Sequence, residues 1–134
     1  MKKLFIILIS ALLCNNLFSQ VLFRGEKCIV SSGYIYQKED VDFPSCHAST
    51  IAEIPGGFIA SWFGGTDEGN PDVGIWISRF ANGSWSKPEE IANGKRENLR
   101  YPCWNPVLYY TGDEILLFFK LGPSPSEWRG EICI

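Results

Sequence analysis

The sequence predicts an all-β fold assembled from a repeated sheet module, and three observations favour it. Short apolar runs end at glycine-rich turns, as residues 58–63 do between the turns at 55–57 and 64–65. No stretch carries apolar residues at a 3.6-residue period over the length of a helix. The order of strand, glycine turn, apolar strand and glycine loop recurs after 57 residues.

Composition supports a folded domain. The 134 residues suffice for one small domain, and 46% of them are hydrophobic and 14% aromatic. These values argue against a disordered tail, a coiled coil and a collagen-like repeat. Twelve basic residues face 15 acidic ones, which gives a formal net charge of −3. The sequence shows no basic patch, so we do not expect nucleic acid as a partner.

Residues 1–20 have the pattern of a secretory signal peptide. A pair of lysines precedes an apolar stretch over 4–14 that is too short to cross a bilayer, and Ser19 is a small residue before a cleavage site. Two alternatives are an uncleaved membrane anchor and a lipoprotein anchor at Cys14, against which the large Leu13 argues. We expect an exported bacterial protein, periplasmic or extracellular, without a membrane span after cleavage.

The exported part keeps four cysteines, Cys28, Cys46, Cys103 and Cys133. Export permits disulfides, and four cysteines allow three pairings between which the sequence does not decide. Buried free thiols are the alternative. No Cys-x-x-Cys pair occurs and His47 is the only histidine, so we expect neither a metal site nor a cofactor.

Residues 21–45 are expected to form an N-terminal strand and a connector. Two short β-type runs, 28–30 and 34–36, lie on either side of a Ser-Ser-Gly turn. The acidic stretch 38–42 then leads into the repeated module.

A complete module follows over residues 46–92. The expected elements in chain order are a strand over 49–54, a buried strand over 58–63, a polar loop over 64–71, a strand over 73–80 and a returning segment with Trp85 and Ile91. The dipeptide Asn82-Gly83 is the strongest hairpin signal in the chain. Four aromatic side chains are expected in the core: Trp62, Phe63, Trp76 and Trp85.

A second module begins at residue 101. The shift of 57 residues aligns 46–51 with 103–108 and 58–63 with 115–120. A four-stranded unit that repeats roughly every 40–60 residues is typical of a β-propeller blade. We therefore expect a partial propeller over 46–134, with one blade over 46–92 and half a blade over 101–134. A blade needs neighbours, so the chain is expected to be a fragment of a longer one.

Five segments resemble the bacterial sialidase-like (neuraminidase-like, BNR-repeat) propellers. They are Cys46-His47-Ala48-Ser49-Thr50-Ile51, Trp62-Phe63-Gly64-Gly65-Thr66, Asp72-Val73-Gly74-Ile75-Trp76, Ser84-Trp85-Ser86-Lys87-Pro88 and Pro102-Cys103-Trp104-Asn105-Pro106-Val107-Leu108. The resemblance covers about residues 44–130. It implies a six-bladed propeller with a glycan site at the mouth of its central channel, and an exo-glycosidase that acts on a glycan containing an acidic sugar.

The resemblance also implies roles for two residues. In that family an Arg-Ile-Pro motif supplies the first of three arginines that bind the substrate carboxylate, and here His47 occupies the place of that arginine. An imidazole lacks the bidentate guanidinium fork, but it exchanges protons near neutral pH. Asp72 falls near the acid/base aspartate of the family. The tyrosine nucleophile, its glutamate and the later arginines would lie beyond Ile134.

His47 and Asp72 are therefore the candidate catalytic residues, and four others are candidates for substrate binding: Arg100, Trp104, Asn105 and Asp67. Arg100 would clamp an anion, Trp104 would stack on a sugar ring, and Asn105 would bond hydroxyl groups. The structural alternatives are a core histidine, solvated turns for the acidic residues, and a tryptophan packed between blades. Trp128 and Arg129 are candidates for a contact at the rim.

Two further functions fit the same residues. One is a propeller rhamnosidase or uronate lyase that uses His47, and the other is a non-catalytic carbohydrate-binding propeller. In each case the partner is a glycan, and the sequence does not indicate an oligomeric state.

Overall fold

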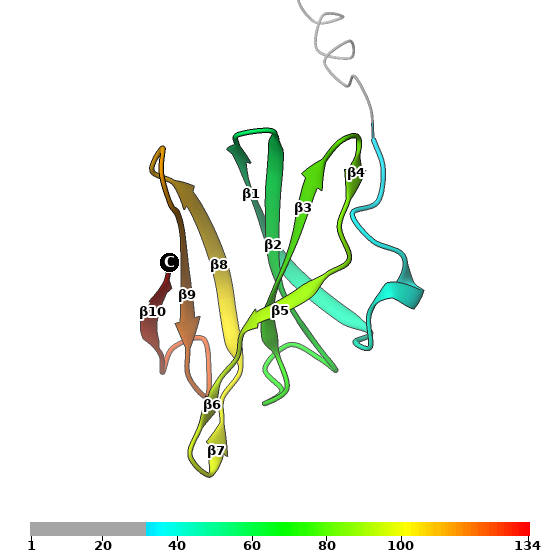
Figure 1. Ribbon diagram of the computed structural model, residues 1–134. Coiled ribbons are helices and arrows are strands. Elements are labelled where there is room, and N and C mark those ends of the chain that lie inside the picture. The colour runs from blue at the N-terminus through cyan, green and yellow to red at the C-terminus, as the bar shows by residue number, and fades with distance from the viewer. Residues whose placement is uncertain (1–31) are drawn as a thin grey trace, which may run out of the picture. The chain divides into compact units, whose positions relative to one another are not determined.

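The computed structural model describes residues 32–134 (Figure 1). The chain divides after Tyr34, and all strands of the described part lie in the unit Ile35–Ile134. A single turn of 3-10 helix, η2 (Lys38–Asp40), precedes them. The strands are β1 (Ser45–Ile54), β2 (Gly57–Gly65), β3 (Gly74–Ala81), β4 (Ser84–Trp85), β5 (Glu89–Ala92), β6 (Lys95–Arg96), β7 (Leu99–Arg100), β8 (Cys103–Tyr110), β9 (Ile115–Leu121) and β10 (Arg129–Cys133).

Several sequence-based expectations fall on residues that the structure does not describe. They are the signal peptide over 1–20, the run over 28–30, and the thiols of Cys14 and Cys28. Between residues 32 and 134 no helix has the length and apolar character needed to cross a membrane.

Two antiparallel sheets carry the fold, which confirms the all-β prediction. The first has the order β1-β2-β3-β4, with β5 also paired to β3, and the second has the order β10-β9-β8. The small hairpin of β6 and β7 lies in the connection between the two sheets and was not predicted. The Asn82-Gly83 hairpin is confirmed, because both residues adopt the positive φ angles, 54° and 82°, of a type I′ turn.

The two sheets repeat each other down to a local irregularity. Cys46 pairs with Gly64 in the first sheet, and the residues 57 positions later, Cys103 and Leu121, pair in the second. The register shifts just after these pairs, at the bulges around Ala48 and Asn105, which have φ angles of 52° and 42°. A bulge changes the direction of the side chains around it. The same change therefore occurs near the start of β1 and of β8, the first strands of the two sheets, which we call the inner strands.

The sheets stack face to face, as neighbouring propeller blades do. On β2, Ile59 and Phe63 pack into a shared core with residues of the second sheet such as Leu117 and Phe119. The first strands of the two sheets, β1 and β8, lie side by side, and the Leu108 amide donates a hydrogen bond to Thr50 Oγ1 at 3.4 Å. The structure is therefore a partial propeller, in which the five-stranded first sheet is one blade and the three-stranded second sheet is part of the next blade.

The opposite face of the first blade is covered by the connector. Tyr36 stacks on Trp62 with 5.1 Å between ring centroids, and Phe43 packs against Trp76 at 4.7 Å. The predicted strand at 34–36 is wrong: Ile35 and Tyr36 form a bend. Their side chains pack onto the sheet face, so the segment is held by aromatic contacts and not by strand pairing.

The four aromatic residues expected in the core do pack there. Trp62 and Phe63 are each 3% exposed. Trp76 and Trp85 are partly buried against the cluster of Phe43, Ala60 and Trp62. β1 begins at Ser45, four residues earlier than expected, because the bulge at Ala48 interrupts its alternation without ending its pairing to β2.

The strand directions bring one set of ends together. β1, β3, β8 and β10 begin, and β2 and β9 end, at the same end of the two sheets, which is lower in Figure 1. We call this the starting end. It is joined across the blades by a hydrogen bond of 3.1 Å from the Cys103 amide to the Val73 carbonyl.

Candidate functional site

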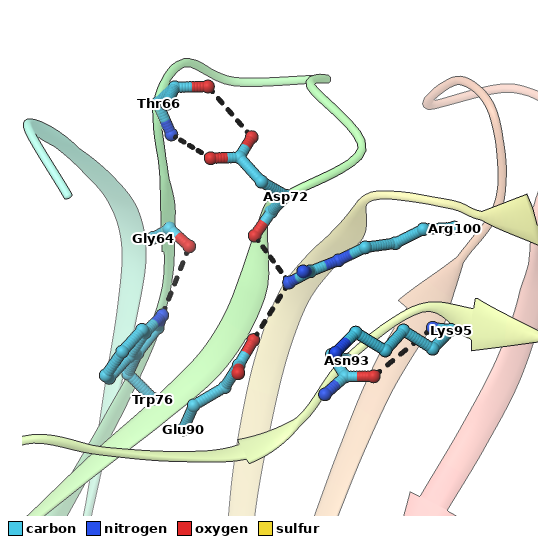
Figure 2. A network of polar contacts seen from close by, with 8 residues as sticks. All are labelled: Gly64, Thr66, Asp72, Trp76, Glu90, Asn93, Lys95 and Arg100. Atoms are coloured by element: carbon cyan, nitrogen blue, oxygen red, sulfur yellow. Dashed lines mark hydrogen bonds and ion pairs between the residues drawn. The ribbon is translucent and has the colours of Figure 1, made fainter. Parts of the chain in front are cut away.

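The loop between β2 and β3 is closed by a carboxylate (Figure 2). Asp72 accepts hydrogen bonds of 2.8 Å from both the amide and the hydroxyl of Thr66. The Asn70 side chain donates to the Thr66 hydroxyl at 2.9 Å. The Asp72 carboxylate is thus held in place at the point where β3 begins.

These contacts determine the ionisation of Asp72. Burial alone would raise its pKa, but the hydrogen bonds from Thr66 and from its own backbone, together with the nearby charge of Arg100, outweigh that effect and lower the pKa below the ordinary 3.8. The side chain is only half-buried. Asp72 is therefore an anion at neutral pH, a weak base, and a hydrogen-bond acceptor.

Arg100 reaches the same loop from β7. Its Nη2 donates to the Asp72 carbonyl at 2.8 Å and to Glu90 Oε1 at 3.1 Å (Figure 2). The Nε is buried and has no hydrogen-bond partner among residues 32–134. The side chains of Arg100 and Glu90 are 28% and 30% exposed. In this geometry the guanidinium holds the loop of Asp72 against β5.

His47 lies on β1 at the edge of the bulge. Its side chain is exposed, and its ring stacks on Phe63 with 5.9 Å between centroids. The neighbouring Cys46 points to the other face, where the Tyr36 hydroxyl donates to its sulfur at 3.1 Å. His47 is thus accessible to solvent and backed by an aromatic wall.

Trp104 and Asn105 begin the inner strand of the second blade. Trp104 is 4% exposed, its Nε1 donates to the Gly122 carbonyl at 3.0 Å, and its ring meets Phe63 edge-on at 6.2 Å. A Cβ atom on Gly69 would lie 3.4 Å from the Trp104 ring. Trp104 therefore packs between the blades, whereas Asn105 is exposed at its bulge.

Asp67 is exposed on the β2–β3 loop. Its Oδ1 accepts the Glu68 amide at 2.9 Å, and its carbonyl accepts the Asn70 amide at 3.1 Å. Both contacts form the turn itself.

The six candidate residues thus gather at the starting end. We call the pair of hydrogen bonds between Thr66 and the Asp72 carboxylate the Asp72 cap. His47 pairs with Phe63, three residues before Thr66, so it lies roughly 10 Å along β2 from this cap. No hydrogen bond joins His47 to Asp72 in the part of the chain that the structure describes.

Sequence reasoning missed two residues that complete the arrangement. Thr66 provides both donors to Asp72, and a hydroxyl six residues before an aspartate across a glycine-rich loop was an available signal. Glu90 positions Arg100, and nothing in its local sequence marks it.

The described residues also bear on metals and thiols. Within residues 32–134 no group of three or more His, Cys, Asp or Glu side chains is arranged to hold a metal ion. Cys46, Cys103 and Cys133 are free thiols. Burial raises the pKa of Cys103 to about 12, so this thiol stays protonated.

The comparison with known families decides the relationship. The family model of the BNR repeat-like domain matches residues 56–133, more than half of the chain. The chain belongs to the BNR repeat-like family. This is the repeat type of sialidase-like propellers, and the BNR match spans strands of both described sheets. The match therefore assigns the chain to a family of sialidase-like or related glycan-active propellers. No curated protein and no solved structure matches the chain.

Proposed function

We propose that the chain supplies two blades of an exported glycan-degrading enzyme that cleaves a glycosidic bond next to an acidic sugar. The observation that carries the proposal is the exposed His47, which lies on the first inner strand at the same end as the anionic Asp72. The BNR repeat supports a glycan as the substrate class. The signal-like residues 1–20 support export.

Each residue would have a separate task. His47, with a solvated ring, would donate a proton to the leaving glycosidic oxygen. Asp72, kept ionised by Thr66, would stabilise positive charge on the sugar ring. Two blades do not close a ring, so an attacking side chain would come from another blade.

The substrate-binding residues divide into contacts and supports. Asn105 is exposed beside the inner strand of the first blade and would bond a sugar hydroxyl. Asp67, exposed on the same loop as Asp72, would bond another. Arg100 and Trp104 would act as positioning residues, because their polar groups bond Asp72, Glu90 and Gly122.

The test is turnover of an oligosaccharide with a terminal sialic or uronic acid by the protein that contains this chain. His47→Asn is expected to lower kcat by about a hundredfold or more, because a positioned proton donor contributes that much. Glu53→Gln is the matched control, since Glu53 is exposed on the same strand but pairs with Phe58 near the far end. It is expected to leave kcat unchanged.

Three results would contradict the proposal. Unchanged turnover by His47→Asn would make His47 a surface residue. Binding of acidic oligosaccharides without any turnover would indicate a carbohydrate-binding propeller. An unsaturated product would indicate a lyase, in which His47 removes a proton from the sugar ring.

A further inference from the structure

A hollow on the second blade combines an aromatic ring with an arginine pair. Its volume is about 560 Å³, and it lies where β9 ends and β10 begins, beside the β6–β7 hairpin at the lower end of Figure 1. Its main lining residues are Arg96, Tyr101, Pro123, Glu127, Trp128 and Arg129. The hollow adjoins the candidate site, because Tyr101 follows Arg100 in the chain and Gly122, which also lines it, bonds Trp104.

Trp128 offers a surface for a sugar ring. It is 50% exposed, which is high for a large aromatic side chain. The Lys120 ammonium lies 5.1 Å from the centre of its ring. Lys120 lines a neighbouring hollow that also includes Asn105, and it does not line the arginine hollow. The ring is thus shared between the two hollows, and the lysine belongs to only one of them.

Arg129 takes part in an ion-pair network. Its Nε lies 2.8 Å from Glu131 Oε1, and the same oxygen accepts a hydrogen bond from Arg96 Nη2 at 3.1 Å. The Arg129 side chain is 63% exposed, and its two terminal nitrogens make no hydrogen bond among the described residues. A guanidinium whose Nε is already paired with a carboxylate leaves those two nitrogens as a fork that matches a second carboxylate.

The charges around the hollow allow an anion to bind. Two arginines, Arg96 and Arg129, and one carboxylate, Glu127, line the hollow itself, while Glu131, which pairs with both arginines, lines the neighbouring hollow. The Glu127 carboxylate is available for sugar hydroxyls. A ligand that carries an anionic group on a hydroxylated ring satisfies the fork, the indole and the carboxylate together.

We propose that this hollow is a subsite for an acidic sugar, with the anionic group on the Arg129 fork and the ring against Trp128. The inference rests on the proposed function for its substrate class and extends it to a site on the second blade. The anionic group is a ring carboxylate. A sulfate ester offers similar oxygens, and the experiment separates the two.

The test is binding of methyl glucuronoside, followed by NMR chemical shifts of the Trp128 indole. Methyl glucoside is the neutral probe and methyl glucoside 6-sulfate is the sulfated one. Arg129→Gln is expected to weaken glucuronoside binding at least about tenfold, because a charge-assisted bidentate contact is lost. Arg129→Lys keeps the charge without the fork, and its affinity for the glucuronoside is expected to lie between those of the parent protein and Arg129→Gln. Trp128→Ala is expected to weaken binding by a similar factor.

The matched control is Arg79→Gln, because Arg79 is exposed on β3 and pairs with Ile59, away from the starting end. It is expected to bind the glucuronoside as the parent protein does. Arg129 is exposed, so its variants fold and carry the test even where Trp128→Ala does not. Unchanged binding by Arg129→Gln, equal binding of the neutral probe, or tighter binding of the sulfated probe would overturn the inference.

The outcome is separable from that of the proposed function. Glucuronoside binding that depends on Arg129, in a protein without turnover, would leave the subsite standing and remove the enzyme. Turnover that depends on His47, with glucuronoside binding unchanged in Arg129→Gln, would support the enzyme and remove the subsite.

Discussion

Replacing Arg100 by glutamine separates two roles for this side chain. The sequence suggests an anion clamp, whereas the structure has its Nη2 on the Asp72 carbonyl and on Glu90. If Arg100 supports the loop, Arg100→Gln should loosen the Asp72 cap. If Arg100 clamps the substrate, the same change should weaken sugar binding and leave the cap intact.

The expected size follows from the two contacts. A hydrogen bond from a charged donor contributes about 1.5–3 kcal/mol, and a partly exposed ion pair contributes about 0.2–1 kcal/mol. Glutamine can recover part of the first contact, and the side chains are nearly a third exposed. We therefore expect a loss of about 1.5–2 kcal/mol, equivalent to a 10–30-fold change in the opening equilibrium of the loop.

The assay is amide hydrogen exchange at Thr66, whose N–H is bonded to the Asp72 carboxylate. Its exchange should accelerate about 10–30-fold in Arg100→Gln and remain unchanged in Arg79→Gln, which removes an exposed arginine outside the loop. Unchanged exchange at Thr66, combined with lost binding of an acidic sugar, would refute the supporting role and establish the clamp.

Three further predictions test the fold and the electrostatics. Under native conditions a soluble alkylating reagent should modify the exposed Cys46 quickly and the fully buried Cys103 slowly, because burial also raises the pKa of Cys103 to about 12. Gly94→Ala should destabilise the protein by about 2 kcal/mol or more in urea unfolding, since a Cβ there collides with the Tyr101 carbonyl. The folded-state pKa of Asp72 is lowered, so its cap should persist from neutral pH to about pH 4 and be lost only as the pH falls further, which carboxyl NMR shifts can follow.

Each of these has a control or an opposing result. Gly130→Ala should cost little, because no atom lies within 4 Å of the added Cβ. Equal alkylation rates for Cys46 and Cys103 would contradict the stacked blades that bury the second thiol. Protonation of Asp72 above its ordinary pKa of 3.8 would contradict the Thr66 cap.

Local patterns predicted most of the fold. Asn82 and Gly83 tolerate positive φ, so the hairpin could be read from two residues. The 57-residue repeat could also be recognised from the sequence, because strand, turn and strand recur in the same order. The bulge at Ala48 was not predictable, since alanine has no preference for a φ of 52°, and only the pairing with β2 imposes it.

The site could be predicted only by position. The candidate residues do lie at one end of the blades, because alternating strand directions bring those ends together. Their contacts depend on residues distant in sequence: Arg100 bonds Asp72 and Glu90, and Trp104 bonds Gly122. No local pattern reports such contacts, so an arginine expected to bind substrate is engaged with the protein.

The central claim is that the starting end of two successive blades receives an acidic glycan. The most direct measurement is a backbone amide NMR map of the protein during titration with a uronate-containing oligosaccharide. We predict that the shift changes concentrate at residues 47, 66–72, 100–105 and 122–129. Changes centred instead on the turns at residues 55–57, 82–83 and 111–114, at the opposite end of the sheets, would contradict the claim.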